Sequence, residues 1–534
     1  MTGAELVPHR HAVRERAVRT LLGVLALALI GAPFYAVGRY EAFRRAVAEQ
    51  QGPPRAAAPQ PAGRPGPPAR DAGAGDTSPV VLAYHDIGRG GRSRYTVTPQ
   101  AFDAQLAALA AAGYRSLSSE EFVAYLRGGR APAPRSVFLT FDDGTHGLWV
   151  HADRILARYR MRAAAFLITG SVGKHRPYYL SWQEIGRMAK SGRWDFQDHT
   201  HSLHRRVQVD AAHRVAPALT GRLWLPRLER PETEREYRGR IERDLDRSVD
   251  EITRHGLPRP RLFAYPFSEA GHRAAPQSTE RALRAVLDER FAAGLTNTSL
   301  RPMPAGRRAA AARQVQRIEV LGSTDARSLL TAVERWTSVS PAECPAPLTE
   351  GHLWRSNDGS QLTGSGVFTG AGPYPGRTGY AAASYRPTSS ADWSHYTVDV
   401  RVGRLREALN SAGLVVRDGS LDPLEVSVSF SYVRLRELRN GRWYEIDRRT
   451  LTDATEHRVG LTVEGDRTVV VVDGRTRIER RSARATGGDA TGGIALSVRS
   501  SGSGGWPRFV SLAVHPSAGG TGGGGADGRA VRPR

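Results

Sequence analysis

The middle of the chain alternates between short apolar runs and longer amphipathic segments, and this alternation restricts the folds open to it. Runs typical of buried strands occupy residues 80–84, 137–141, 163–169 and 194–198. Segments with helical spacing of their apolar residues occupy residues 99–112, 119–126, 182–191 and 234–255. Strands that alternate with helices build a parallel sheet with crossover helices. We therefore predict an α/β domain over residues 79–343, arranged as a parallel barrel.

Paired carboxylates follow one of the predicted strands. Residues 140–144 read Thr-Phe-Asp-Asp-Gly, so the apolar run stops sharply at Asp142 and Asp143. Active groups of α/β folds lie at the carboxyl ends of strands. A simple turn with a helix N-cap explains this motif equally well when it is taken alone.

Histidines follow a second predicted strand, in the sequence His-Thr-His-Ser-Leu-His at residues 199–204. His199 and His204 would point about 140° apart on a helix and to opposite faces on a strand. They can share an ion only if a turn intervenes, and Thr200 and Ser202 suit a turn. One carboxylate with two imidazoles is a ligand set for metal-assisted hydrolysis, with a second carboxylate left as a base. A polar loop without function is the alternative.

In combination these motifs resemble the polysaccharide deacetylase family, the NodB-type homology domain of carbohydrate esterase family 4. The longer His-Thr-x-x-Leu-His form resembles the branch that deacetylates poly-β-1,6-N-acetylglucosamine. Residues 81–85 (Val-Leu-Ala-Tyr-His) and residues 263–266 (Phe-Ala-Tyr-Pro) resemble the same branch. The resemblance spans residues 79–340 and implies a distorted (β/α) barrel with fewer than eight complete strands.

The resemblance implies a role for each residue of the first two motifs. Asp142 would be the general base, and Asp143, His199 and His204 would hold one divalent ion, zinc. His201 is the alternative to His204 as a ligand. In this scheme the ion polarises an acetamide carbonyl and lowers the pKa of a bound water, and Asp142 takes the proton of that water.

The third motif would stabilise the oxyanion. In the family, the backbone N–H that follows the proline of this motif donates to the tetrahedral intermediate. That position falls on Phe267, next to Tyr265, and we predict both as catalytic residues. A rigid strand end is the alternative interpretation of the Tyr-Pro pair.

The general acid is not evident from the motifs. The family supplies a histidine in its last motif, but residues 317–320 read Arg-Ile-Glu-Val. His85, His201 and Glu319 are the candidates for protonating the leaving amine. Arg261 would be placed to orient the base, although a surface charge is the more ordinary role in such an arginine-rich chain.

The N-terminal part carries the pattern of an export signal. Residues 1–19 are basic and are predicted to lie in the cytoplasm, while residues 20–38 contain no charge and are long enough to span a bilayer. We predict an uncleaved signal anchor, with a cleaved signal peptide as the alternative. Residues 39–78 form a Pro-, Ala- and Gly-rich linker. This places the catalytic domain outside the cytoplasm, at the cell membrane or, after cleavage, secreted.

The helical pattern ends near Cys344 and a strand pattern replaces it. Residues 345–516 are predicted to form an antiparallel β-sandwich, similar to concanavalin-like jelly rolls. The Gly-rich tail, residues 517–534, is predicted to be disordered. Three tryptophans would be able to stack on sugars, with ordinary packing as the alternative: Trp354, Trp393 and Trp443.

Composition excludes some partners. The net charge of +23 would suit an anionic partner. However, Lys174 and Lys190 are the only lysines and alanine, glycine and proline are abundant, which indicates a general composition bias. No basic and aromatic cluster of a nucleic-acid reader is present. Cys344 is the only cysteine, so an intrachain disulfide is impossible and a thiolate metal site is excluded.

The sequence therefore predicts a membrane-anchored, metal-dependent polysaccharide N-deacetylase with an accessory β-sandwich, acting on an N-acetylated polysaccharide. An O-acetyl esterase on the same scaffold is the alternative within the enzyme class. A catalytically inactive glycan-binding or wall-tethering protein is the alternative outside it. The retained aspartates and histidines argue against an inactive protein, whereas the missing last-motif histidine argues for it.

Overall fold

A computed structural model describes most of the chain after residue 77. The described ranges are residues 78–89, 93–271, 276–356, 364–374, 379–406, 410–439, 441–482, 490–500 and 505–517. The predicted anchor at residues 20–38 lies outside them, as do the linker up to residue 77 and the tail from residue 518. None of the helices in the described ranges has the length and hydropathy needed to cross a membrane.

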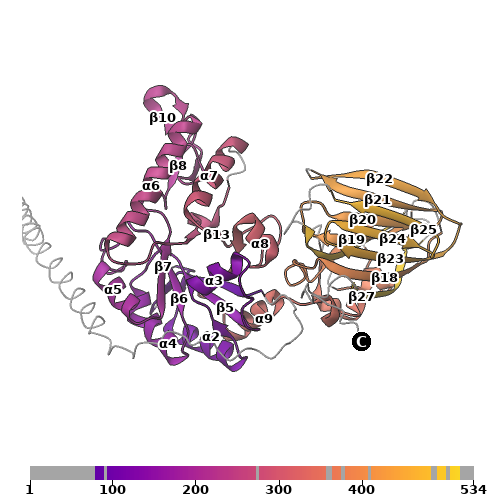
Figure 1. Cartoon of the computed structure of the whole chain (residues 1–534), viewed down its shortest axis with the longest axis horizontal. Helices are drawn as coiled ribbons and strands as arrows, with labels where there is room; N and C mark the ends of the chain where they lie inside the picture. The colour runs from indigo at the N-terminus through magenta and orange to yellow at the C-terminus, as the bar shows by residue number, and fades with distance from the viewer. Residues whose placement is uncertain are drawn as a thin grey trace, which may run out of the picture. The chain divides into compact units, whose positions relative to one another are not determined.

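The N-terminal half of the described chain is a nearly closed parallel barrel (Figure 1). Its strands follow the order β14-β13-β12-β7-β6-β5-β1-β15, and β4 pairs with β5 beside this path. The strands are β1 (Val80–Tyr84), β4 (Arg115–Ser116), β5 (Ser136–Phe141), β6 (Ala163–Leu167), β7 (Trp194–Asp198), β12 (Leu262–Ala264), β13 (Ala293–Thr296), β14 (Gln314–Gln316) and β15 (Ile318–Glu319). The predicted fold class is confirmed. The sheet passes through eight strands, more than the resemblance implies, although β15 has only two residues.

The two edges of this sheet meet at one residue. β14 and β15 lie at opposite ends of the strand order but are consecutive in the sequence, and only Arg317 separates them. The Arg317 N–H donates to the carbonyl of Thr296 on β13. The seam of the barrel is therefore spanned by the chain itself and not by a ladder of hydrogen bonds between β14 and β15.

Helices surround the barrel, at positions that the apolar spacing predicts. They are α2 (Pro99–Ala111), α3 (Ser119–Leu126), α4 (Asp153–Arg158), α5 (Trp182–Lys190), α6 (Glu234–Arg254), α7 (Gln277–Arg290), α8 (Arg307–Ala312) and α9 (Ala326–Trp336). Ser118, Ser181 and Thr233 begin α3, α5 and α6, and each forms a capping box with the glutamate three residues later. Two otherwise unsatisfied backbone N–H groups are bonded in each box, which fixes where these helices start.

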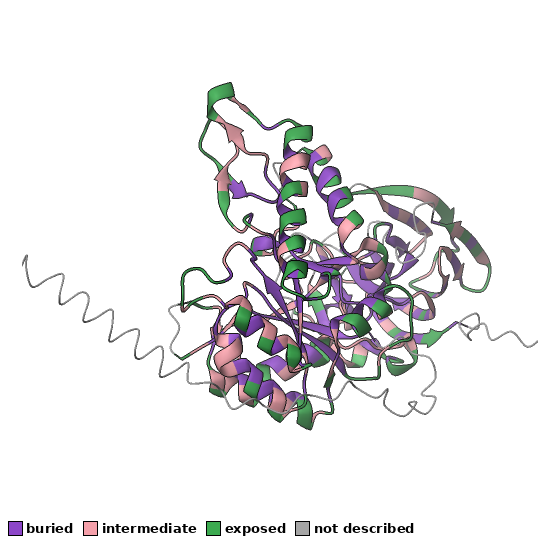
Figure 2. Cartoon of the chain, turned by 60° about the vertical axis from the view of Figure 1, so that its left-hand side comes forward, coloured by how far each residue is buried: buried purple, intermediate pink, exposed green. Residues whose placement is uncertain are grey.

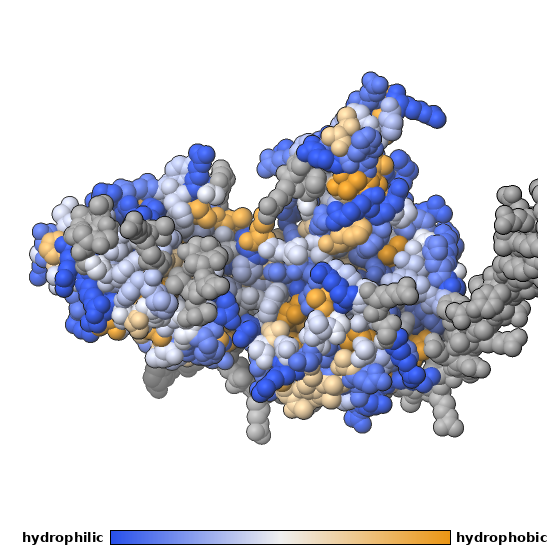
Figure 3. Space-filling model, turned by 180° about the vertical axis from the view of Figure 1, so that it is seen from behind, coloured by the Kyte–Doolittle hydropathy of each residue, from blue (hydrophilic) through white to orange (hydrophobic). Residues whose placement is uncertain are grey.

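The barrel strands are buried on both faces, as parallel strands usually are (Figure 2). On β5, Leu139 packs with the surrounding helices while Phe138 packs with residues of α3 and α8 inside the barrel. Figure 3 shows one face of the molecule, on which apolar residues form small groups among polar ones.

Several short strands are attached to the barrel near the histidine motif. The predicted insertion at residues 205–231 forms two small hairpins: β8 (Arg206–Gln208) with β9 (Val215–Pro217), and β10 (Trp224–Leu225) with β11 (Arg230–Pro231). β2 (Asp86–Ile87) and β3 (Thr96–Val97) pair after β1. The insertion begins directly after His204, so its first hairpin lies next to the candidate metal ligands.

The C-terminal part consists of two antiparallel sheets with one hydrophobic core, as the strand pattern predicts. The seven-stranded sheet has the order β16-β17-β26-β19-β20-β21-β22, and the five-stranded sheet has the order β25-β24-β23-β18-β27. The first sheet contains β16 (Trp354–Ser356), β17 (Tyr380–Tyr385), β26 (Gly493–Arg499), β19 (Ser411–Asp418), β20 (Leu424–Ser429), β21 (Tyr432–Arg439) and β22 (Arg442–Thr450). The second contains β25 (Thr476–Arg481), β24 (Arg467–Val472), β23 (Glu456–Glu464), β18 (His395–Gly403) and β27 (Arg508–Pro516).

The core of the sandwich accounts for two of the three tryptophans and for the cysteine. Trp354 and Trp393 are buried, and their indole N–H groups donate to backbone carbonyls of Pro347 and Val339. They are packing residues and cannot stack on a sugar. Cys344 is also buried in this core and Val339 packs against it, so sandwich packing begins before residue 345.

Candidate metal centre

The aspartate and histidine motifs meet at one rim of the barrel. The first follows β5 and the second follows β7, and β6 lies between these two strands in the parallel sheet. Parallel strands present their carboxyl ends at the same rim, which is where α/β barrels carry their active groups.

Asp143, His199 and His204 form a compact cluster at this rim. Asp143 Oδ1 lies 3.5 Å from His199 Nε2 and 3.6 Å from His204 Nε2. One ligand atom from each residue lies within 4.8 Å of the other two. Asp143 Oδ1 is buried and has no hydrogen-bond partner among the described residues. A buried carboxylate oxygen that faces two imidazole nitrogens fits a divalent ion with nitrogen and oxygen ligands, such as zinc.

A turn brings the two histidines together, as the sequence predicts. Thr200 adopts a left-handed conformation with φ of 72°. The Thr200 N–H donates to Asp198, and its hydroxyl accepts from the Leu203 N–H. As a result, the ring centroids of His199 and His204 lie 4.8 Å apart. His199 Nδ1 donates to the carbonyl of Ala264 at 2.8 Å, which leaves Nε2 free as a ligand.

The charge states suit metal binding. Burial and the neighbouring charge of His199 lower the pKa of His204 to about 4, so its imidazole is neutral at physiological pH. Burial by itself would raise the pKa of Asp143, but the close contact with His199 and the charges of His199, His204 and His85 together outweigh burial, so the pKa is lowered. A neutral imidazole and an ionised carboxylate are the forms that bind a metal ion.

His201 is directed elsewhere. Its Nδ1 lies 3.0 Å from the Thr169 hydroxyl, and its backbone N–H donates to Asp244. It does not belong to the three-residue cluster, so the geometry favours His204 over His201 as a ligand.

Asp142 lies beside the cluster and is held by a buried arginine. Both terminal nitrogens of Arg317 donate to the Asp142 carboxylate, at 2.8 and 2.7 Å, and both side chains are almost completely buried. Thr140 and Asn297 accept from the same guanidinium. Burial by itself would raise the pKa of Asp142, but the charge and hydrogen bonds of Arg317, together with the nearby charges of His199 and His85, outweigh burial and hold the pKa well below its usual range. Asp142 is therefore anionic at physiological pH.

Arg317 is a site residue that the sequence motifs did not reveal. It begins the last motif, which drew attention only for its missing histidine. The alternative partner, Arg261, is exposed, and its backbone N–H donates to Gln197. Arg261 is thus a surface charge. No local signal marked Arg317, because polar residues such as Gln316 and Glu319 lie on both sides of it and its anionic partner is 175 residues away.

The backbone at Asp143 and Gly144 separates the two carboxylates. Both residues are left-handed, with φ of 72° and 73°. Asp142 can therefore face Arg317 while Asp143 faces the histidines. A Cβ atom on Gly144 would lie 2.8 Å from Leu167 Cδ2, so a larger residue would be strained and crowded at this position.

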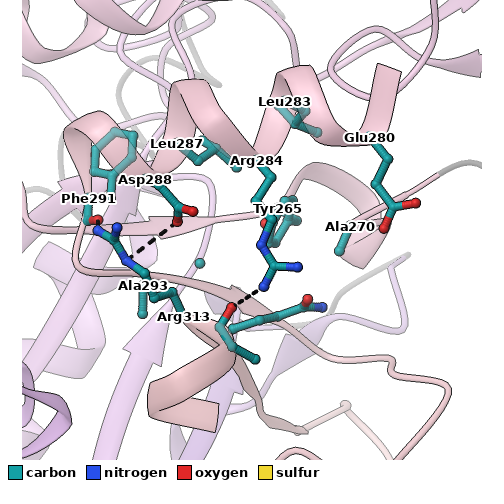
Figure 4. A pocket seen from close by; sticks show the side chains of 13 residues that line it. Tyr265, Ala270, Glu280, Leu283, Arg284, Leu287, Asp288, Phe291, Ala293 and Arg313 are labelled. Carbon is teal, nitrogen blue, oxygen red and sulfur yellow. Dashed lines mark hydrogen bonds and ion pairs between the residues drawn. The ribbon is translucent and has the colours of Figure 1, made fainter. Parts of the chain in front are cut away.

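The side chain of Tyr265 does not reach the cluster, which corrects its predicted catalytic role. Its ring packs against Phe263 on the helix side of β12 and lines a small cavity of about 30 Å³ bordered by α7 and β13 (Figure 4). Its N–H donates to the Leu295 carbonyl. Burial raises the pKa of the Tyr265 hydroxyl. Tyr265 therefore supports the rim from outside, and none of the cluster residues lines this cavity.

Phe267 does lie at the cluster. Its ring centroid is 4.6 Å from that of His204, and the Arg206 guanidinium lies 4.8 Å from the same ring. Its backbone is left-handed, with φ of 58°. The use of its N–H for an oxyanion stays a prediction.

Of the three candidates for the general acid, only His85 is among the charges that act on both carboxylates. It follows β1, and its positive form acts on both Asp142 and Asp143 to lower their pKa values. Its Nδ1 is buried and has no hydrogen-bond partner among the described residues. Glu319 instead accepts from Asn297 and lies 3.9 Å from Arg94.

Comparison with known proteins agrees with this site. Residues 129–286 match the family model described as polysaccharide deacetylase, and this segment contains both aspartates, both cluster histidines and the third motif. The predicted resemblance is confirmed for residues 129–286, which are similar to polysaccharide deacetylases.

Two curated relatives extend the comparison. A poly-β-1,6-N-acetyl-D-glucosamine N-deacetylase of Staphylococcus epidermidis is 37% identical over 113 residues, which cover 21% of this chain and 39% of the relative. The protein of the same name from Staphylococcus aureus is 28% identical over 176 residues, covering 32% of this chain and 54% of the relative. The chain thus spans about half the length, or less, of the curated relatives it matches.

Parts of the chain also align with solved structures. A de-N-acetylase from Aggregatibacter actinomycetemcomitans aligns at a TM-score of 0.41 with 19% identity, covering 47% of this chain and 98% of that one. IcaB from Ammonifex degensii aligns at a TM-score of 0.37 with 24% identity, and the alignment covers 48% of this chain and 96% of that one. The carbohydrate-binding module CBM66 from Bacillus subtilis aligns at a TM-score of 0.23 with 14% identity, and the alignment covers 30% of this chain and 94% of that one.

Removal of one ligand tests the cluster. His204→Ala should lose most of the bound divalent metal while the protein stays folded, because two ligands hold an ion far less well than three. Elemental analysis of the purified variant measures this. His201→Ala is the matched control and should keep its metal, and a full metal content in His204→Ala would contradict the assignment.

Removal of the arginine tests its pairing with Asp142. Arg317→Met leaves a buried carboxylate without its partner and should lower the free energy of unfolding by about 3–5 kcal/mol. Urea denaturation followed by circular dichroism measures the change. Arg261→Met, an exposed control, should change it by less than about 0.5 kcal/mol. Equal effects of the two substitutions would show that the buried pair does not stabilise the barrel.

Proposed function

We propose that this protein is a polysaccharide N-deacetylase that removes acetyl groups from N-acetylglucosamine units of a cell-surface polymer. The observation that carries the proposal is the Asp143–His199–His204 cluster beside the Arg317-paired Asp142, in a segment similar to polysaccharide deacetylases. The names of the two curated relatives favour a β-1,6-linked polymer as substrate. The uncharged segment at residues 20–38 supports a membrane-anchored enzyme working outside the cytoplasm.

The chain's own residues would divide the reaction between them. A zinc ion held by Asp143, His199 and His204 would polarise the acetamide carbonyl and acidify the attacking water. Asp142 would accept the proton of that water. Its carboxylate keeps lone pairs free for this step, since a carboxylate offers about four acceptor sites and Arg317 uses two of them. The constant Arg317 charge keeps Asp142 anionic and therefore ready to accept.

The leaving amine needs a proton when the C–N bond of the intermediate breaks. We assign this step to His85, because its charge acts on both aspartates and its buried Nδ1 has no partner among the described residues, whereas His201 and Glu319 are bonded elsewhere. Acetate and a free amine are the products. The N–H of Phe267 is the candidate oxyanion donor, and its ring would border the bound sugar.

An O-acetyl esterase would use the same groups and differ in its leaving group. An alkoxide leaves more easily than an amine, so an esterase would depend less on His85. Incubating the protein with β-1,6- and β-1,4-linked N-acetylglucosamine oligomers and with an O-acetylated sugar distinguishes the two activities. Mass spectrometry of each product, with and without a chelator, records the acetyl groups lost.

Removal of the base tests the mechanism. Asp142→Asn keeps the shape of the side chain but not the proton acceptor, so turnover should fall at least about a hundredfold with metal content nearly unchanged. Acetate release and elemental analysis are measured on the same sample. Turnover near that of the original protein would mean that Asp142 only positions Arg317 and Asp143.

Deletion of the sandwich tests its contribution. The barrel has hydrophobic clusters separate from the sandwich core, so a chain ending at Ser338 should fold and keep its activity on short oligomers. Activity on long polymer should fall, because a second contact raises the effective substrate concentration. Equal loss on both substrates would mean that the sandwich supports the barrel or completes its cleft.

A further inference from the structure

Trp443 is the one tryptophan of the described residues with an exposed side chain, 39% accessible. We propose that it forms the centre of a second glycan-binding site, on the outer face of the seven-stranded sheet, that holds N-acetylated units of the polymer. The identity of the sugar rests on the proposed function. The site itself rests on three neighbouring strands, β20, β21 and β22 (Figure 1).

Strand register puts the key side chains on one face. Glu425 of β20 lies directly opposite Arg436 of β21, and Trp443 of β22 lies opposite Leu438. Arg436 and Leu438 are two residues apart and therefore point to the same side. The other side of β21 carries Leu435 in the hydrophobic core. Glu425, Arg436 and Trp443 thus share the face that points away from the core.

These three side chains are already held in place. The Arg436 guanidinium stacks at 5.5 Å from the Trp443 ring and pairs with Glu425 through Nε and one terminal nitrogen. Glu425 is almost buried, and its second oxygen accepts from the Ser497 hydroxyl. The other terminal nitrogen of Arg436 has no bond to a described residue, so its N–H groups are available to a ligand.

The floor next to this group is made of small residues. Ser427 and Ser497 lie on the outer faces of β20 and β26, and Gly413 lies on β19 between them. A Cβ atom on Gly413 would lie 2.3 Å from Ser497 Oγ and 3.0 Å from Glu425 Oε1. These residues are almost completely buried, so they hold Glu425 in place from behind, and the parts of the group open to a ligand are the Trp443 ring and the remaining terminal nitrogen of Arg436.

This combination suits a pyranose ring. The negative face of an aromatic ring attracts the polarised C–H groups of a sugar, and fixed polar groups beside it bond to hydroxyl and acetamide oxygens. A guanidinium locked in plane by a carboxylate and a ring loses little freedom when it donates to such an oxygen. The acetamide carbonyl is a suitable acceptor for the remaining Arg436 donors.

The surrounding charge favours acetylated over deacetylated units. Arg434 and Arg448 lie opposite each other near the site, and Glu445 is shared between them at 4.0 and 2.9 Å. Cations therefore exceed anions around the ring. A deacetylated unit carries an ammonium group, which this surface repels. We infer that the sandwich holds the enzyme on polymer that is still acetylated and releases it where deacetylation is complete.

Retention on immobilised polymer tests the inference. The full chain carrying Asp142→Asn, which should leave the polymer intact, is passed over poly-β-1,6-N-acetylglucosamine resin, fully deacetylated resin and bare resin. Trp443→Ala added to this chain should weaken retention on the acetylated resin about tenfold, about 1.4 kcal/mol. Tyr444→Ala is the matched control, because Tyr444 is also exposed, at 47%, but faces the other side of β22.

The outcomes separate the site from its alternatives. Trp443→Tyr keeps an aromatic ring and should retain binding, which guards against a folding defect in Trp443→Ala. Equal retention of Trp443→Ala and Tyr444→Ala, or stronger retention on deacetylated resin, would overturn the inference. In the chain with Asp142 restored, both variants should deacetylate short oligomers normally. Absence of deacetylation together with Trp443-dependent retention would refute the proposed function and leave the binding site standing.

Discussion

The ion pair between Arg317 and Asp142 is the interaction on which the rest of the site depends. Arg317 is the single residue between the two edge strands of the barrel, and its guanidinium reaches the carboxylate that follows β5. Two buried charges remain in a protein interior only when they are paired and hydrogen-bonded, and Thr140 and Asn297 complete this bonding. One residue thus spans the seam of the barrel with its backbone and keeps Asp142 charged with its side chain.

Much of the barrel could be predicted, because its signals are local. Helix starts depend on residues three positions apart, and α3, α5 and α6 begin at the predicted residues. The apolar runs marked β5 and β7, whose carboxyl ends carry the metal motifs. The turn between His199 and His204 followed from their spacing, since no regular element would bring them together.

The rest depends on contacts between distant segments, which one sequence does not reveal. Arg317 and Asp142 lie 175 residues apart, and nothing local distinguishes Arg317 from Arg261. Tyr265 shares a motif with Phe267, but the alternation of β12 turns its ring to the helix side. Trp354 and Trp443 both lie on predicted sandwich segments, yet only the assembled sheets decide that the first is buried and the second exposed.

Asp142 and Asp143 are neighbours in the chain, which leaves the loops around them free to change. Since the proposed base, Asp142, and one proposed metal ligand, Asp143, are adjacent residues, covalent geometry sets their separation, with Cα atoms about 3.8 Å apart. Loops can therefore be rebuilt around them without disturbing the chemistry. The hairpins that begin directly after His204 are such an addition. Under the proposed function, changes in these loops would alter substrate preference over evolutionary time, while the residues of the hydrolytic step stay the same.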